Sequence, residues 1–457
     1  MNLAAVVLAA GKGTRMKSRL PKVLHKLCGK PMLSYVVEAA SAAGVQKIVV
    51  VVGHGADLVA REVEGAALVA VQSEQLGTGH ALMQAGPHFG GFSGQILVLC
   101  GDIPLISPAT LAGLVESHRA SGAAATVMTA EVENPEGYGR VVRDGHGRVR
   151  KIVEQKDASP EERQIREINT GIYCFEAAGL FDALARLGPA NAQGEYYLTD
   201  IIEMYAENGR KVGAFAADNP AEVAGVNDRV QLAAVERYMR LRILEDLMMS
   251  GVTVIDPAST FVDRAAAVGR DTVIYPFTFI EGKTVIGEDC VIGPGSRLVD
   301  STVGKSVTVI NSIVLESTIG DRCYIGPFAF LRPETRLGCD VKVGDFVEIK
   351  KSEIGDGSKV PHLSYVGDAV IGKKVNIGAG TITCNYDGYK KSPTRIGDGA
   401  FIGSNTNLVA PLEIGPGAVT GAGSTITRDV PAGALGVERA RQVVVPDWAG
   451  KVRGKKR

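Results

Sequence analysis

The chain has 457 residues, which is too long for a single hydrophobic core, so we expect two or three domains. Lysine plus arginine and aspartate plus glutamate number 50 each, and this zero net charge argues against a general role in binding nucleic acid or a membrane surface. Seven cysteines without CxxC spacing indicate reduced thiols in a cytoplasmic protein, and the absence of any run of about 20 apolar residues argues against membrane insertion.

The first half of the chain alternates short apolar runs with helical stretches. Buried parallel strands are expected at 6–8, 48–52, 96–99 and 126–128. Helices are expected between them, among others at 32–43 and 81–85. The apolar segment 1–10 is expected to be the first strand rather than a signal peptide. This pattern predicts a doubly wound, Rossmann-like α/β domain, in which ligands bind at the carboxyl ends of the strands.

A glycine-rich loop follows the first strand. It carries two glycines of a dinucleotide-binding fingerprint, but Met16 stands where the third should be, and no Gly-Lys-Ser/Thr closes a P-loop. Such loops are often only tight turns. Here Lys12, Arg15 and Lys22 add cations where a triphosphate could lie against backbone N–H groups.

Further polar residues follow other predicted strands. Asp102 comes soon after the run 96–99, where it could hold a metal ion at the rim of the crevice or simply cap a helix or turn. Gln72 and the pair Gly77-Thr78 follow another predicted strand. These residues extend the candidate nucleotide site along the same edge of the sheet.

A long helix is expected at 228–249, because this stretch has apolar residues at helical spacing and contains no glycine or proline. Asp228 is well placed to cap it, and Gly251 to end it. The predicted organisation is therefore a nucleotide-binding domain at 1–227, a linker helix at 228–249, a repeat domain at 250–436 and a tail at 437–457.

In the second half of the chain an aliphatic residue recurs at every sixth position, a sequence repeat that we call the aliphatic beat. Between Ile313 and Ile349 an aliphatic residue occurs at every sixth position, seven times in succession, and the beat is also present at 274–298 and 396–414. Neither an amphipathic helix nor an ordinary strand has this period. A parallel β-helix does, because each short flat face needs one inward side chain, and roughly ten coils of about 18 residues are expected.

The beat is interrupted at 384–393, a polar and aromatic segment that is too long for a corner. Insertions of this kind project from one face of a solenoid and often bind ligand. Cys384 borders the insertion, but the surrounding sequence offers little support for a role as a nucleophile.

Bulky polar residues also interrupt the repeats. They include Arg332, Glu348, Lys350, His362, Tyr365 and Asn376. Arg332 and Lys350 are 18 positions apart, which is one full coil, so we expect them to stack. A lone histidine on a β-helix is usually a surface residue, but His362 with a carboxylate and two cations nearby indicates a site. Glu348 and His362 are 14 positions apart, and the short repeat between Ile349 and Ile354 shifts the register, so that their side chains could converge. A carboxylate beside the imidazole would raise its basicity.

The segment LAAGKGTRM, followed by Leu20-Pro21-Lys22, resembles the signature of sugar-1-phosphate nucleotidyltransferases. With the hexapeptide half attached, residues 3–440 resemble the bacterial bifunctional N-acetylglucosamine-1-phosphate uridyltransferase/glucosamine-1-phosphate acetyltransferases. The resemblance implies that the β-helix is left-handed and forms a homotrimer. Neither property follows from the periodicity.

For the first half, the resemblance implies UTP and UDP-N-acetylglucosamine binding by Leu8, Ala9, Ala10, Gly11, Lys22, Gln72, Gly77, Thr78, Cys100, Gly101, Gly139, Glu154, Asn169 and Asn227. It implies Mg²⁺ at Asp102 and Asn227, with Arg15 and Lys22 neutralising charge during uridylyl transfer. The family usually has an aromatic residue at the position of Cys100.

For the second half, the resemblance implies acetyl transfer from acetyl-CoA to glucosamine 1-phosphate, with His362 as the base and Glu348 supporting it. Arg332, Lys350 and Lys391 would bind the sugar phosphate, and Tyr365 and Asn376 would position the sugar. Asn385 and Tyr386 would position the sugar and contact acetyl-CoA, whose groove would be lined by Ala379, Ser404, Ala422 and Arg439.

The resulting hypothesis is a cytoplasmic enzyme of UDP-N-acetylglucosamine synthesis, and hence of peptidoglycan and lipopolysaccharide synthesis. It would acetylate glucosamine 1-phosphate in its C-terminal half and join the product to UMP in its N-terminal half. The alternative is a nucleotidyltransferase with a single function, whose β-helix serves oligomerisation or regulation. Release of CoA from acetyl-CoA distinguishes the two.

Overall fold

The computed structural model describes residues 2–453, which form two compact units divided between Met239 and Arg240. The boundary falls within helix α7 (Arg229–Met249), where the Asp228 carboxylate accepts the backbone N–H of Gln231 at 2.8 Å as the expected N-cap. Met1 of the predicted first strand and residues 454–457 of the predicted tail lie outside the described residues.

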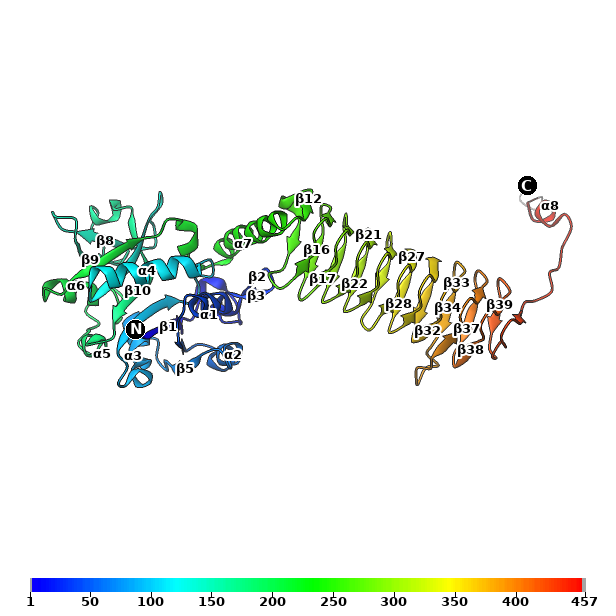
Figure 1. Ribbon diagram of the computed structural model, residues 1–457, viewed down its shortest axis with the longest axis horizontal. Coiled ribbons are helices and arrows are strands. Elements are labelled where there is room, and N and C mark those ends of the chain that lie inside the picture. Colours follow the sequence, from blue (N-terminus) through cyan, green and yellow to red (C-terminus); the bar gives the residue numbers. More distant parts are fainter. Residues whose placement is uncertain (1, 454–457) are drawn as a thin grey trace. The chain divides into compact units, whose positions relative to one another are not determined.

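The first unit is built on a nine-stranded mixed sheet (Figure 1) with the main strand order β11-β7-β10-β6-β1-β4-β5. These strands are β11 (Val212–Ala216), β7 (Ala125–Glu131), β10 (Glu167–Glu176), β6 (Gly94–Cys100), β1 (Asn2–Ala9), β4 (Lys47–Val52) and β5 (Leu68–Val71). Strands β8 (Gly139–Arg143) and β9 (Val149–Val153) extend the sheet from β10, and β2 (Lys26–Leu27) pairs separately with β3 (Lys30–Pro31).

The four strands expected from the sequence all occur and all run in one direction. β1 pairs in parallel with β4 and with β6, while β10 is antiparallel to both β6 and β7. The expectation of purely parallel strands is therefore incomplete, because β10 reaches its place between β6 and β7 through a long connection that local sequence patterns do not describe.

Helices cover both faces of this sheet, which confirms the doubly wound α/β class. Successive residues of a strand point to opposite faces, so Val7 and Val50 belong to one buried core and Val6 and Val49 to the other. The first core includes residues of α1 (Met32–Ala42), α2 (Ala56–Glu62) and α4 (Pro108–Ser121). The second includes residues of α3 (Thr78–Gln84), α5 (Leu180–Leu184) and α6 (Asp200–Glu207). Short 3₁₀ turns occur at Thr14–Met16, Lys22–Leu24, Gly86–Phe89, Glu162–Gln164, Pro220–Val223 and Pro257–Ser259.

The second unit is a parallel β-helix whose three sheets have 11, 10 and 9 strands, in agreement with the predicted number of coils and with the left-handed hexapeptide fold (Figure 1). The first sheet contains β12 (Thr253–Val254), β15 (Val273–Ile274), β18 (Val291–Ile292), β21 (Thr308–Val309), β24 (Tyr324–Ile325), β27 (Lys342–Asp345), β30 (Lys359–His362), β33 (Asn376–Ile377), β36 (Phe401–Ile402), β39 (Val419–Thr420) and β41 (Leu435–Gly436).

The other two sheets are built in the same way. The second contains β13 (Phe261–Val262), β16 (Phe279–Glu281), β19 (Arg297–Val299), β22 (Ile313–Leu315), β25 (Phe330–Leu331), β28 (Glu348–Lys350), β31 (Tyr365–Gly367), β34 (Ile382–Cys384), β37 (Asn407–Val409) and β40 (Thr425–Ile426). The third contains β14 (Ala267–Val268), β17 (Val285–Ile286), β20 (Thr302–Val303), β23 (Thr318–Ile319), β26 (Arg336–Leu337), β29 (Glu353–Ile354), β32 (Ala369–Ile371), β35 (Thr394–Ile396) and β38 (Leu412–Ile414).

The aliphatic beat fills the interior of this β-helix with one exception. Ile319, Ile325 and Leu331 are buried, as are the other predicted members from Leu337 to Ile349. Ile313 is instead exposed, and its neighbour Val314 is buried and pairs with Leu298 and Leu331. The prediction for Ile313 is wrong because this coil is shorter than 18 residues, which shifts the inward position by one.

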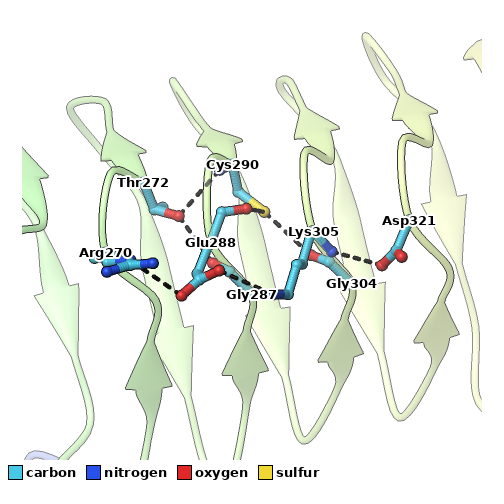
Figure 2. A network of polar contacts seen from close by, with 8 residues as sticks. All are labelled: Arg270, Thr272, Gly287, Glu288, Cys290, Gly304, Lys305 and Asp321. Carbon is cyan, nitrogen blue, oxygen red and sulfur yellow. Dashed lines mark hydrogen bonds and ion pairs between the residues drawn. The ribbon is translucent and has the colours of Figure 1, made fainter.

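The corners of successive coils are joined by backbone and side-chain contacts, as Figure 2 shows for one stretch. The Glu288 carboxylate lies 2.9 Å from the Lys305 ammonium and 3.2 Å from the Arg270 guanidinium. Thr272 donates its hydroxyl to the Gly287 carbonyl at 2.9 Å. A Cβ on Gly287 would lie 2.6 Å from the Gly304 carbonyl oxygen, so this corner requires glycine.

The predicted insertion lies between β34 and β35 and projects from the coils (Figure 1). It is closed by a bridge between Tyr386 and Lys391. The last described helix is α8 (Trp448–Arg453). All seven cysteines are free thiols, and within residues 2–453 no helix has the length and apolarity needed to cross a bilayer.

Two candidate active sites

A cavity of about 540 Å³ opens at the carboxyl ends of β1, β5 and β6 in the first unit. Its lining contains ten residues that the sequence assigned to nucleotide and metal: Leu8, Ala9, Ala10, Gly11, Lys22, Gln72, Gly77, Thr78, Cys100 and Asp102. The glycine-rich loop packs directly on Lys22, because a Cβ on Gly13 would lie 2.7 Å from the Lys22 Cβ. The structure therefore brings together residues from four separate segments of the sequence.

One end of the cavity is held rigid by contacts around Gln72. The Gln72 amide donates to the Gly77 carbonyl at 3.1 Å and contacts His80 Nδ1 at 3.0 Å. Gly77 has φ +114°, and a Cβ there would lie 2.6 Å from the Tyr196 carbonyl oxygen. This close backbone approach requires glycine and places Thr78 at the start of α3.

Two of the lining residues, Lys22 and Asp102, belong to a polar cluster that also includes Arg15 and Asn227. The Lys22 ammonium donates to the Asp102 carboxylate and lies 3.3 Å from Asn227 Oδ1. Arg15 donates to the same Asn227 oxygen at 2.9 Å. Carboxylate and amide oxygens that converge on a cation are suited to Mg²⁺, so these residues fit the implied metal.

No group of three or more His, Cys, Asp or Glu side chains within residues 2–453 could hold a metal ion. A magnesium ion at Asp102 and Asn227 would therefore take its remaining ligands from water and phosphate oxygens, as Mg²⁺ commonly does.

Three further predicted residues meet outside the lining of the cavity. A Cβ on Gly139 would lie 3.5 Å from the Asn169 Cβ and 3.6 Å from a Glu154 carboxylate oxygen, so the three positions converge. Burial raises the pKa of Glu154, and nearby Asp157 adds to the effect. None of the three lines the cavity bordered by Lys12 and Lys22, and a carboxyl and an amide suit neutral hydroxyl groups better than a second phosphate.

Cys100 and Gly101 follow β6 directly. The Cys100 thiol contacts the Gly171 carbonyl at 3.4 Å, and burial raises its pKa to about 12. The thiol is therefore protonated and unreactive at neutral pH. The Gly101 backbone N–H donates to the Leu8 carbonyl at 3.0 Å, which ties this turn to the first strand.

The second candidate site contains three cationic side chains on neighbouring coils. Arg332 and Lys350 lie at the same level of adjacent coils, because Leu331 pairs with Ile349. Lys391 comes from the insertion, and its proximity lowers the pKa of Lys350, as expected for two crowded cations. The predicted stacking of Arg332 on Lys350 is confirmed.

The predicted support of His362 by Glu348 is not what the structure shows. Glu348 accepts a hydrogen bond from Arg332 at 2.7 Å, whereas His362 Nδ1 lies 2.5 Å from a carboxylate oxygen of Asp345. Asp345 stands 17 positions before His362, and the two residues are paired in adjacent strands β27 and β30. The sequence argument recognised the short repeat between Ile349 and Ile354 but did not consider Asp345, the carboxylate that this 17-residue coil places beside His362.

The remaining predicted sugar contacts surround the insertion. The Asn385 amide donates to the Asp368 carboxylate at 2.5 Å, and a Cβ on Gly367 would lie 2.5 Å from the Tyr365 hydroxyl oxygen. Asn376 lies in β33, next to β30, which carries His362. Tyr386 is exposed, and its hydroxyl donates to the Gly388 carbonyl at 2.6 Å. Burial raises the pKa of the Cys384 thiol, which argues against a nucleophilic role.

The predicted acetyl-CoA residues form a ladder along one corner. The backbone N–H of Asn405 donates to the Ala379 carbonyl at 2.6 Å, and that of Gly423 donates to the Ser404 carbonyl at 2.8 Å. Ala379, Ser404 and Ala422 therefore occupy equivalent places in successive coils. Arg439 reaches this corner, because a Cβ on Gly423 would lie 3.7 Å from its Cδ.

Sequence reasoning missed several residues besides Asp345. Gln75 and Glu195 line the first cavity, and Asp368 holds Asn385 in the second site. Gln75 follows the same strand as Gln72 and could have been suspected from that position. Glu195 and Asp368 are brought in by tertiary structure alone.

The two units define a class of protein: a nucleotidyltransferase domain joined to a hexapeptide β-helix. Comparison with known families agrees, since the family described as Nucleotidyl transferase matches residues 4–220. The family described as Bacterial transferase hexapeptide (six repeats) matches residues 266–299 and 393–428.

Similar proteins extend this likeness to the full length of the chain. A relative named Bifunctional protein GlmU from Pelotomaculum thermopropionicum is 74% identical over 456 residues, which is 100% of both chains. Proteins of the same name from Heliobacterium modesticaldum and Syntrophomonas wolfei are 57% and 55% identical and cover 98% of this chain and 98% and 99% of their own lengths.

The chain belongs to the family of bifunctional GlmU proteins. The resemblance noted in the sequence is thereby confirmed, and with it the predicted enzyme class: a uridyltransferase and acetyltransferase of UDP-N-acetylglucosamine synthesis. The alternative of a single function is correspondingly disfavoured.

Proposed function

We propose that the cavity of the first unit binds UTP with its base at Gln72, Gly77 and Thr78 and its phosphates along the glycine-rich loop. This orientation is supported by charge, since Lys12 and Lys22 line the loop end of the cavity. Leu8, Ala9, Ala10 and Gly11 present backbone groups to the base and ribose, and Cys100 and Gly101 close the wall beside them.

N-acetylglucosamine 1-phosphate is proposed to bind with its sugar at Gly139, Glu154 and Asn169, which converge. A phosphate oxygen of this substrate attacks the α-phosphorus of UTP, the new P–O bond forms, and the bond to pyrophosphate breaks. A phosphate is already a competent nucleophile, so no general base is required. Arg15 and Lys22 neutralise the charge on the phosphates and orient them in line.

Mg²⁺ bound at Asp102 and Asn227 would supply further neutralisation of charge on the phosphate oxygens. Lys22 contacts both of these residues. We propose that Lys22 turns from Asp102 to a phosphate oxygen when substrate and metal are bound.

In the second unit we propose that His362 accepts a proton of the glucosamine 1-phosphate amine. The uncharged amine nitrogen attacks the thioester carbonyl carbon of acetyl-CoA, and His362 takes one of its two protons as the C–N bond forms. The C–S bond breaks, the CoA sulfur leaves as a thiolate, and the amide nitrogen keeps one hydrogen. The proton passes from His362 to that sulfur. Arg332, Lys350 and Lys391 bind the sugar phosphate.

The other residues of this site are proposed to position the two substrates. Tyr365, Asn376, Asn385 and Tyr386 surround the sugar. The small residues along the corner formed by Ala379, Ser404 and Ala422 let the pantetheine arm lie close to the coils, and Arg439 closes that groove.

A homotrimer through the β-helix is proposed to complete the acetyl-transfer site. Its residues stand on an open surface in the single chain, and the His362 side chain is 55% exposed. The neighbouring cavity of about 540 Å³ is lined by Lys391 and Asp368 but is not lined by His362. A second chain placed against this face would enclose the substrates. The enzyme is proposed to act in the cytoplasm, where its substrates would be found, and its domain limits are those predicted from the sequence.

The observation that carries the proposal is the presence of two separate charged clusters, one in each unit. Crossed variants test it. Asp102→Ala should lose release of pyrophosphate from UTP and keep release of CoA from acetyl-CoA, whereas His362→Ala should show the reverse. Equal loss of both activities in either variant would contradict the assignment, and absence of CoA release from the wild-type chain would favour a noncatalytic β-helix.

A further inference from the structure

His362 and Asp345 form a paired unit at one corner of the β-helix. His362 Nδ1 lies 2.5 Å from Asp345 Oδ1, and no other side chain within residues 2–453 has a recorded hydrogen bond to this imidazole. The hydrogen bond to His362 is the first cause that lowers the pKa of the Asp345 carboxyl. Asp345 is therefore an anion at neutral pH and accepts the bond, which makes Nδ1 the donor.

The backbone holds the two side chains in register. Asp345 pairs with His362 across β27 and β30, and the Leu363 N–H donates to the Asp345 carbonyl at 3.0 Å. The residues just before the pair approach so closely that a Cβ on Gly344 would lie 1.8 Å from the Pro361 carbonyl oxygen. Gly344 thus permits a contact between coils that no other residue would allow.

Both members of the pair also precede equivalent corners. Phe346 has φ 54° and Leu363 has φ 49°, so the chain turns in the same left-handed conformation after Asp345 and after His362. The two side chains leave adjacent coils from matching positions. Their contact is built into the repeat and does not depend on a flexible loop.

The charged side chains nearest in sequence to the pair either bond to another residue or lie at the opposite end of the same strand. Glu348 accepts a hydrogen bond from Arg332 at 2.7 Å, whereas the described part of the chain shows no hydrogen bond between Glu348 and His362. Lys342 lies in β27 with Asp345, and Lys359 lies in β30 with His362. Both lysines begin their strands, whereas Asp345 and His362 end them.

We propose that Asp345 is a positioning residue for acetyl transfer, which holds His362 in the tautomer with its proton on Nδ1 and directs the Nε2 lone pair toward the substrate amine. The inference rests on the proposed role of His362 as base. It differs from the expectation drawn from the sequence, since it gives the orienting role to Asp345 and leaves Glu348 to hold Arg332 in place for the sugar phosphate. Asp345 itself keeps its charge throughout and exchanges no proton with the substrate.

The first test is the tautomer of His362 in the wild-type enzyme. Selective ¹⁵N labelling of histidine distinguishes a protonated Nδ1 from a protonated Nε2, and the His362 signals are identified by their absence in His362→Ala. We expect the proton on Nδ1 at a pH where the imidazole is neutral. A proton on Nε2 would overturn the proposal, whatever the variants show.

The second test is the variant Asp345→Asn, which keeps the shape of the side chain and removes its charge. We expect kcat for acetyl transfer to fall by about 10- to 100-fold, with KM for acetyl-CoA and for glucosamine 1-phosphate changed by less than about twofold. Asp345→Glu should recover part of the loss because it restores a carboxylate. Uridylyl transfer should be unchanged in both variants, which reports that the chain is folded.

Asp340→Asn is the matched control, since Asp340 is also a carboxylate at a corner, five positions earlier, and is paired with Arg322 at 2.7 Å. Its kcat should equal that of the wild type. If Asp345→Asn also keeps wild-type kcat while His362→Ala is inactive in acetyl transfer, the role of Asp345 is refuted and that of His362 stands. If His362→Ala itself remains active, the proposed function of His362 is wrong.

Discussion

Lys22 offers a sharp test of the nucleotide site, because its ammonium lies between the two residues assigned to magnesium. It donates to Asp102 and lies 3.3 Å from Asn227 Oδ1, and the side chains of Lys22 and Asp102 are only 15% and 18% exposed. A divalent ion with oxygen ligands at about 2.1 Å cannot share this space with the ammonium. Metal binding without nucleotide must therefore displace Lys22.

The expected size of this competition follows from the bond that must be broken. A hydrogen bond to a charged group contributes about 1.5–3 kcal/mol, and each 1.4 kcal/mol is about tenfold in affinity. Removing the ammonium in Lys22→Met should therefore tighten metal binding in the absence of nucleotide by about 10- to 100-fold, although the same variant loses a phosphate contact and should be poor at uridylyl transfer.

The measurement uses Mn²⁺ in place of Mg²⁺, with free Mn²⁺ determined by electron paramagnetic resonance in the absence of UTP. Lys12→Met is the matched control, since Lys12 lines the same cavity but has no recorded bond to Asp102 within residues 2–453, and its Mn²⁺ affinity should match the wild type. Asp102→Ala should bind Mn²⁺ weakly both when Lys22 is kept and when it is combined with Lys22→Met. Unchanged or weaker Mn²⁺ binding by Lys22→Met would refute the reasoning.

Two further predictions concern stability. Ile325→Ala, which truncates a fully buried side chain of β24, should lower the free energy of unfolding by about 2–5 kcal/mol, measured by urea denaturation followed by circular dichroism. Ile313→Ala, at an outward position, should lower it far less. Equal losses in the two variants would contradict the inward register described above. Burial raises the pKa of Asp200 to about 6, so the folded chain keeps this proton to a higher pH than the unfolded chain, and stability falls as pH rises from about 4 to about 6. Asp200→Asn should therefore raise the melting temperature at pH 7.5 and leave it nearly unchanged near pH 4. If the variant is no more stable than the wild type at pH 7.5, burial of the Asp200 carboxylate does not destabilise the folded chain.

Much of the fold could be read from local periodicity. The four predicted strands of the first unit alternate between two cores, and the six-residue repeat of the second unit places its aliphatic residues inside the coils, with Ile313 as the exception. Both patterns reflect a repeating geometry that acts over a few residues. The grouping of residues around the first cavity could likewise be anticipated, because residues that follow parallel strands meet at one edge of the sheet.

Predictions failed where a small change in length altered which side chains meet. One short coil moved Val314 into the interior in place of Ile313, and another brought Asp345, rather than Glu348, beside His362. The antiparallel strand β10 belongs with these failures, since its place between β6 and β7 depends on distant pairing.

The sequence by itself determined the two architectures and the chemical types at each site, because hydrophobic period and residue type act locally. Only the tertiary structure decided the partners of individual charges: Lys22 with Asp102, Arg332 with Glu348 and His362 with Asp345. A hydrogen bond forms within about 3 Å, whereas one residue of register moves a side chain to the opposite face of a strand. Pairing therefore depends on a register that composition and period leave open.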